Sequence, residues 1–159
     1  MEIKLWINNK EFIDEISPDT ILLDFLRDKG FLSVKRGCET ANCGLCTVMC
    51  DDKPILSCST LAIRANNRHV TTIEGLQEEA KEFGGFLADE GAEQCGFCSP
   101  GFIMSVLSMV KELNNPSEDE IKRYLEGNLC RCTGYMGQLR AIKKYLNLKQ
   151  TKENEHEVC

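Results

Sequence analysis

Hydrophobic and polar positions alternate in short runs over the first 75 residues, which predicts a β-rich half. Ile3, Leu5 and Ile7 share one side of the first run, because successive side chains of a strand point to opposite faces. One helix is expected in this half, beginning at Ser17 and ending at Gly30. The same pattern predicts strands over residues 3–7, 11–16, 47–49, 54–57 and 70–73.

The pattern changes to helical spacing after Gly75. Ser117 and Glu120 have the spacing of a capping box, in which each side chain bonds the backbone of the other at a helix start. Other helices are expected over residues 76–88, 102–113 and 139–148. The chain is therefore expected to divide into residues 1–75, a four-helix part over 76–148, and a polar, mobile tail over 149–159.

Charge and hydropathy argue against two classes of partner. The net charge is −6, and no run of basic residues is longer than Lys143-Lys144, which argues against a nucleic-acid surface. The longest apolar stretch, residues 101–110, is far shorter than the ~20 residues of a membrane-spanning helix. Strand-like alternation begins at the first residues, which predicts no signal peptide. We therefore expect a cytoplasmic location.

Ten cysteines are unusual in a chain of 159 residues, and most of them lie in close groups. A disulfide framework is typical of small secreted proteins, so the expected location argues against one. Tight groups such as Cys95/Cys98 and Cys130/Cys132 suit a shared metal centre better than cross-links between distant segments.

The first group has the spacing C-x4-C-x2-C, with a fourth cysteine twelve positions later. This is the spacing of plant-type [2Fe–2S] ferredoxins, in which one compact loop supplies three of the four thiolates. Gly37 and Gly44 suit such a loop, because inward backbone N–H groups stabilise the negative charge of a cluster. Zinc sites usually combine two short cysteine pairs or add histidines, which fits this group poorly. The expected ligands are Cys38, Cys43, Cys46 and Cys58.

The second group combines C-x2-C with C-x-C, and its candidate ligands are Cys95, Cys98, Cys130 and Cys132. Four cysteines with this spacing suit zinc as well as an iron–sulfur cluster, so the spacing leaves both open. Each pair lies beside a predicted helix. Unpaired N–H groups and the positive dipole end at a helix start favour an anionic cluster.

The remaining cysteines and both histidines lie outside the two groups. A Rieske centre would need two histidine ligands, and His69 and His156 are expected to have no metal role. Cys50 alternates with apolar neighbours and is expected to be a small buried side chain. Cys159 is expected to be a free thiol in the tail.

Two longer motifs resemble one known family. They are Gln-Cys-Gly-Phe-Cys-Ser-Pro-Gly from Gln94 and Gly-Asn-Leu-Cys-Arg-Cys-Thr-Gly-Tyr from Gly127. In this order after the first cysteine group, they resemble the small iron–sulfur subunit of the molybdenum hydroxylases, such as xanthine dehydrogenase and aldehyde oxidoreductase. The resemblance covers residues 3–146. Where the family often has Glu-Gly, this chain has Ala41-Asn42, and Asn42 is expected to take the left-handed conformation of the glycine.

The resemblance implies the fold and the cofactors. The fold class would be α+β, with an N-terminal plant-type ferredoxin (β-grasp) domain followed by a C-terminal helical-bundle [2Fe–2S] domain. Both cysteine groups would then hold a [2Fe–2S] cluster, which removes the zinc alternative at the second group. Molybdopterin would lie on a large partner subunit and FAD on a medium one.

The resemblance also implies a function within an oxidoreductase complex. Electrons from the molybdenum centre would reach the helical-domain cluster first, then the ferredoxin-type cluster, and then FAD. Gln94 would hydrogen-bond the pterin and Cys132 would contact it through sulfur. The chain alone would catalyse no substrate reaction, and the complex would act on a purine such as xanthine. The alternative is a free-standing two-cluster ferredoxin-like carrier, although a simple carrier needs only ~75 residues.

Overall fold

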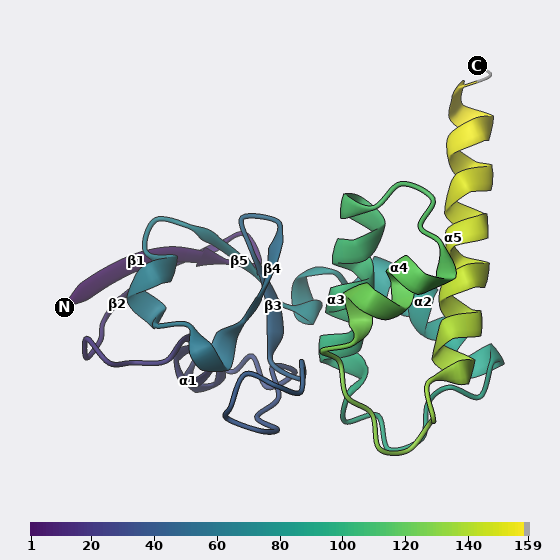
Figure 1. Cartoon of the computed structure of the whole chain (residues 1–159). Helices are drawn as coiled ribbons and strands as arrows, with labels where there is room; N and C mark the ends of the chain where they lie inside the picture. The colour runs from purple at the N-terminus through teal and green to yellow at the C-terminus, as the bar shows by residue number, and fades with distance from the viewer. Residues whose placement is uncertain (158–159) are drawn as a thin grey trace.

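The structure is a computed structural model that describes the backbone of residues 1–157 and the side chains of residues 1–151. Cys159 and the side chain of His156 therefore lie outside the described residues. Figure 1 shows two halves side by side, a sheet with one helix and a bundle of helices. No helix within this described part is long and apolar enough to cross a membrane.

The first half is built on a five-stranded sheet with the strand order β2-β1-β5-β3-β4. β1 pairs antiparallel with β2 and parallel with β5, while β3 pairs antiparallel with both β4 and β5. The predicted strands are confirmed, with ends that differ by one or two residues. Their bounds are β1 (Glu2–Ile7), β2 (Lys10–Glu15), β3 (Thr47–Cys50), β4 (Lys53–Leu56) and β5 (His69–Thr71).

One face of the sheet is covered by α1 (Leu22–Asp28). Ile3, Leu5 and Ile7 are buried as the alternation predicted, and they pack in one core with Leu22 and Leu26. Short 3₁₀ helices connect the later strands: η1 (Ser57–Ser59), η2 (Ala62–Ala65) and η3 (Ile73–Gly75). The prediction of a helix start at Ser17 is wrong, since residues 17–20 form a turn with a Thr20 N–H to Ser17 carbonyl bond of 3.0 Å. Ile21 is held extended by a β-bridge to Leu61, so the helix begins only after it.

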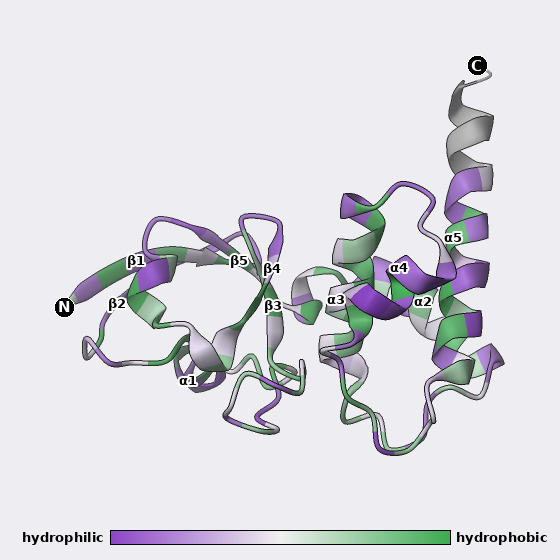
Figure 2. Cartoon of the chain, viewed as in Figure 1, coloured by the Kyte–Doolittle hydropathy of each residue, from purple (hydrophilic) through white to green (hydrophobic). Residues whose placement is uncertain are grey.

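The second half contains four helices, of which α3 is central and has most of its residues buried. The bounds are α2 (Gln77–Asp89), α3 (Ser99–Glu112), α4 (Glu118–Leu125) and α5 (Met136–Glu157). The predicted capping box at Ser117 and Glu120 is present at the start of α4. Figure 2 shows that α4 is mostly hydrophilic, and Ile121 is its buried residue. α4 therefore lies on the outside of the bundle.

The last helix differs from its prediction at both ends. It begins at Met136 rather than Leu139 and continues to Glu157, beyond the predicted end at Leu148. Residues 138–157 contain neither proline nor glycine, and most are good helix formers. The Lys149 ammonium pairs with Glu82 of α2 at 2.6 Å, which ties this part of α5 to the bundle. Figure 1 shows the last turns extending beyond the other helices.

The two halves meet where the first cysteine loop reaches the start of α3. Met49 of β3 packs in the core of the helical half, so the two hydrophobic cores adjoin. A Cβ at Gly101 would overlap the Gly44 carbonyl oxygen and lie 2.9 Å from Leu45 Cα. Gly44 itself has a φ of +72°, and a Cβ there would lie 2.6 Å from the Gly127 carbonyl oxygen. Backbone therefore packs against backbone at this joint.

We predict that Gly101→Ala lowers the free energy of unfolding by about 1–3 kcal/mol, because the added methyl overpacks the joint. The matched control is Gly85→Ala in α2, where no atom lies within 4 Å of the added Cβ. That change should stabilise the helix by about 0.5–1 kcal/mol. Denaturant unfolding of both variants measures the difference, and equal stabilities would contradict the close approach.

Candidate iron–sulfur centres

The first site is the loop that precedes β3, together with one residue of η1. Cys43 and Cys46 are buried, while Cys38 and Cys58 are half-buried. The loop turns sharply: Glu39 and Ala41 have positive φ values of 58° and 55°. The left-handed position predicted at Asn42 is thus occupied by Ala41 instead. This turn aims the Asn42 N–H at the Cys38 sulfur, 3.4 Å away.

The thiols of the first site differ in their ease of ionisation. Backbone N–H groups of Thr40 and Asn42 lower the pKa of Cys38 to about 6. Burial raises the pKa of Cys46 to about 11. A cysteine binds a metal as the thiolate, so a buried thiol of this kind must lose its proton on ligation. Metal binding at this site therefore releases protons. The same inward N–H groups suit a negatively charged cluster.

The second site lies between the starts of two helices. Cys98 is the N-cap residue of α3, and Cys95 precedes it in a turn with Gly96 at a φ of +73°. Cys130 and Cys132 lie in the loop before α5. Each pair is thus flanked by helices, as the sequence predicted: the first precedes α3, and the second lies between α4 and α5. The unpaired N–H groups and dipoles of such starts favour an anion between them.

Burial and local hydrogen bonds act in opposite directions on the second set of thiols. Burial raises the pKa of Cys98 to about 12. Burial also opposes ionisation of Cys130, yet a hydrogen bond from the Thr133 hydroxyl, 3.1 Å from the sulfur, contributes to a lowered pKa of Cys130. Cys95 and Cys132 are exposed, and their sulfur atoms lie 3.6 Å apart.

The eight thiols lie in contacting pairs, two pairs at each site. At the second site the two pairs adjoin, since the Cys98 thiol interacts with Cys95 as well as with Cys130. A [2Fe–2S] cluster has two irons and four cysteine ligands, so two pairs of thiols suit it. The pairs are Cys38 with Cys43, Cys46 with Cys58, Cys95 with Cys132, and Cys98 with Cys130.

A backbone hydrogen bond connects the two sites. The Leu129 N–H donates to the Cys43 carbonyl oxygen at 2.9 Å, and Leu129 is bonded directly to Cys130. Asn128 is buried beside this bond, and its side-chain amide donates to the Gly44 carbonyl oxygen at 3.4 Å. Sequence reasoning assigned no role to Leu129 or Asn128. The Leu129 contact is made by the backbone, which leaves no signal in residue type, and the Asn128 amide bonds residues distant in sequence.

The outer side of the second site is exposed and apolar. The Gln94 side-chain amide donates to the Cys132 carbonyl oxygen at 3.1 Å, so the structure brings these two predicted residues together. Cys95 and Cys132 share a surface hollow with three exposed hydrophobic side chains, each 44–48% exposed: Phe97, Leu129 and Tyr135. We call this surface the cysteine face. Clustered apolar and aromatic side chains of this kind mark interaction sites.

Cys50 and His69 belong to neither cysteine group, and the structure describes both. Cys50 in β3 is 5% exposed, which confirms it as a buried side chain. His69 is exposed in β5, and its ring stacks on Trp6 with 4.9 Å between ring centroids. It contributes to the sheet surface.

Comparison with known proteins identifies both halves. Residues 6–88 match the family described as the 2Fe-2S iron-sulfur cluster binding domain. Residues 72–143 match the family described as the [2Fe-2S] binding domain. The chain therefore carries two [2Fe–2S]-binding domains in the order ferredoxin-type, then helical.

Relatives and a solved structure cover almost the whole chain. The xanthine dehydrogenase iron-sulfur-binding subunit of Escherichia coli O157:H7 is 46% identical, with 84% of this chain and 86% of that protein covered. The nicotinate dehydrogenase small FeS subunit of Eubacterium barkeri is 37% identical, with 90% and 92% covered. The aldehyde oxidoreductase structure from Desulfovibrio gigas superposes with a TM-score of 0.87 at 32% identity, over 96% of this chain and 17% of that longer chain. The chain thus belongs to the family of small [2Fe–2S] iron–sulfur subunits of the xanthine dehydrogenase-type molybdenum hydroxylases.

Proposed function

We propose that this chain relays electrons, inside a molybdopterin-dependent hydroxylase complex, from the molybdenum centre of a large subunit towards FAD in a medium subunit. The observation that carries the proposal is the hydrogen bond from the Leu129 N–H to the Cys43 carbonyl oxygen, 2.9 Å long. It joins the backbone beside one proposed ligand to the backbone of another.

The eight paired cysteines are the proposed ligands. Cys38, Cys43, Cys46 and Cys58 hold the ferredoxin-type cluster, and Cys95, Cys98, Cys130 and Cys132 hold the helical-domain cluster. Each [2Fe–2S] cluster accepts and releases one electron at a time. The protein surrounds these anionic groups with backbone N–H donors at the first loop and helix starts at the second.

The route between the two ligand sets is short and mostly covalent. From Cys130 it follows one peptide bond to Leu129, crosses the hydrogen bond, and reaches the Cys43 backbone. Asn128 braces this crossing through its bonds to the carbonyl oxygens of Gly44 and Gly101. A bonded route of this kind transmits electronic coupling better than a gap of the same length.

The cysteine face is the proposed contact with the large subunit. Exposed Cys132 is the proposed point of electron entry, and Gln94 and Cys132 are the proposed pterin contacts. Exposed Phe97 and Tyr135 fit this assignment, because aromatic residues are enriched in protein interfaces. The exposed part of the first loop, residues 39–42, is the proposed exit towards the flavin subunit.

The substrate and the compartment complete the proposal. Relatives named for xanthine and nicotinate are both similar to this chain, and we propose a purine such as xanthine as substrate. A different subunit recognises it. We place the complex in the cytoplasm, because free thiols persist in a reducing compartment.

The holo-chain should contain about four irons, from two clusters of two.

Cys132→Ser should disturb the EPR signal of the helical-domain cluster and leave the ferredoxin-type signal intact, because the two sites share no ligand. Cys50→Ala is the matched control, since Cys50 is buried in β3 and outside both sites. Loss of both signals in Cys132→Ser, or of either signal in the control, contradicts the ligand assignment.

Leu129→Pro should slow electron transfer between the clusters, because proline has no N–H to donate to Cys43. Leu129→Ala keeps the N–H and should transfer electrons at the wild-type rate. Rapid-freeze EPR after photoreduction of the complex measures the rate, and both cluster signals confirm that each variant is folded. Equal rates for the two variants would exclude this bond as the route.

The isolated chain should hydroxylate no substrate, because its described side chains form two thiol sites and a relay between them. Incubation of the purified holo-chain with xanthine, nicotinate or an aldehyde, followed by chromatography of the products, tests this. The reconstituted complex is the positive control. Turnover by the chain alone would refute a pure relay.

A further inference from the structure

Thr133 follows the second pair of cysteines in the motif Cys-Arg-Cys-Thr-Gly-Tyr, and the relay described above gives it no part. Its hydroxyl oxygen lies 3.1 Å from the Cys130 sulfur, closer than the 3.4 Å between the Asn42 nitrogen and the Cys38 sulfur. A cysteine that binds a metal carries no proton, so its sulfur can only accept a hydrogen bond. The Thr133 hydroxyl is therefore the donor in this contact.

The turn that leads into α5 fixes the direction of this hydroxyl. Gly134 and Tyr135 have positive φ values of 67° and 68°, so the backbone folds back on itself after Thr133. The Tyr135 N–H reaches the Thr133 hydroxyl oxygen at 3.4 Å and donates to it. Because that bond occupies a lone pair of the oxygen, the hydroxyl proton is left to point at the sulfur.

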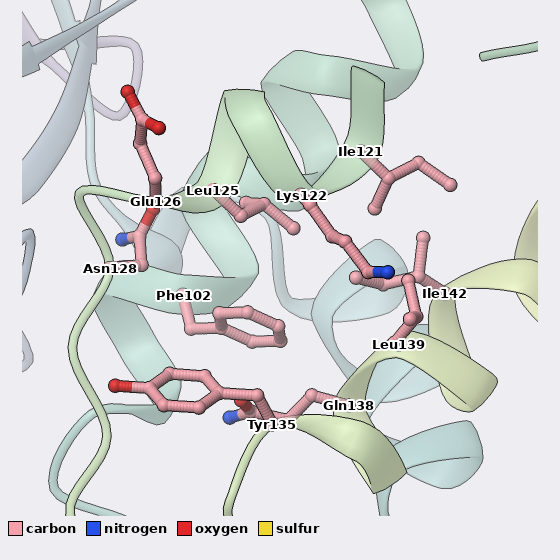
Figure 3. A pocket seen from close by; sticks show the side chains of 10 residues that line it. All are labelled: Phe102, Ile121, Lys122, Leu125, Glu126, Asn128, Tyr135, Gln138, Leu139 and Ile142. Carbon is pink, nitrogen blue, oxygen red and sulfur yellow. The ribbon is translucent and has the colours of Figure 1, made fainter. Parts of the chain in front are cut away.

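Tyr135 also closes the turn with its side chain. The Cys130 N–H donates to the Tyr135 hydroxyl oxygen at 3.0 Å, and Figure 3 shows this hydroxyl beside the chain segment that continues from Asn128. Residues 130–135 are thus joined by a ring of three hydrogen bonds that includes the Cys130 sulfur. Thr133 and Cys130 are both half-buried, and partial exclusion of water strengthens the electrostatic effect of the contact.

A hydrogen-bond donor at a ligand sulfur affects the two redox states of a cluster unequally. Reduction adds one electron, and part of the added negative charge lies on the ligand sulfurs. Hydrogen bonds become stronger as the acceptor becomes more negative, so the donor stabilises the reduced state more than the oxidised state. Hydrogen bonds to the sulfurs are among the features that set the reduction potential of iron–sulfur clusters.

We propose that Thr133 is a positioning residue whose hydroxyl raises the reduction potential of the helical-domain cluster through Cys130. The proposal rests on the cluster ligation proposed above. One peptide bond separates Cys130 from Leu129, so Thr133 acts on the ligand from which the relay leaves this cluster. A higher potential makes the cluster a better acceptor of electrons from a molybdenum centre.

Thr133→Val tests the proposal, because valine has nearly the shape of threonine and lacks the hydroxyl. EPR of the full chain with both clusters loaded, poised at a series of fixed potentials, measures the midpoint potential of each cluster. At the wild-type midpoint, the ratio of reduced to oxidised helical-domain cluster should fall about tenfold in the variant, which corresponds to about 59 mV for one electron. The ferredoxin-type cluster should keep its wild-type potential, since its proposed ligands lie outside this turn.

Two control variants separate the hydroxyl from the rest of the side chain. Thr133→Ser keeps the hydroxyl and should keep the wild-type potential of the helical-domain cluster. Thr151→Val removes a hydroxyl that donates to the Asn147 carbonyl oxygen in α5, and it should change neither potential. An unchanged potential in Thr133→Val, equal shifts in the serine and valine variants, or equal shifts of both clusters overturns the proposal. Loss of the helical-domain signal in Thr133→Val also overturns it, because Thr133 would then build the site rather than tune it.

These outcomes are distinct from a failure of the proposed function. Disturbance by Cys132→Ser identifies the helical-domain signal, and a wild-type chain with fewer than two cluster signals would contradict the ligand assignment itself. The potentials are measured on the chain without its partner subunits, so they do not depend on electron transfer within a complex.

Discussion

The close backbone contact between the first cysteine loop and the helical half is the constraint on which the rest of this structure depends. Glycine at 44 and at 101 lets two backbones meet where any side chain would collide. Only at this separation can the Leu129 N–H reach the Cys43 carbonyl oxygen. Beside this contact, Met49 of the sheet packs in the core of the helical half and so connects the two hydrophobic cores. Domain packing and the proposed electron route therefore share one interface.

Each group of cysteines lies beside backbone N–H groups that stabilise negative charge. Four thiolates around two irons carry negative charge, and a protein interior stabilises that charge with fixed N–H dipoles. The first loop supplies them through left-handed residues such as Ala41. At the second site Cys98 caps α3, and backbone N–H groups of Cys132 and Thr133, in the loop before α5, contribute to the lowered pKa of Cys130. Two different backbone solutions therefore meet the same electrostatic need in the two halves.

The two sites also differ in exposure. Cys43 and Cys46 are buried, whereas Cys95 and Cys132 are exposed on the cysteine face among apolar side chains. A redox site that exchanges electrons with another subunit needs a short distance to the surface. The exposed second site suits the proposed contact with a large subunit.

The cysteine groups, the strands and the capped start of α4 were all predictable from the amino-acid sequence. These are local features, since ligand spacing, alternation and capping each depend on residues close in the chain. Two helix ends differ from the prediction. A β-bridge from Leu61 to Ile21 delays the start of α1. α5 continues after Leu148 through good helix formers, with one ion pair from Lys149 to Glu82 of α2. The folded structure was needed to show which thiols contact each other and that Leu129 connects the two sites. Those facts depend on segments distant in sequence, and backbone contacts carry no residue-type signal.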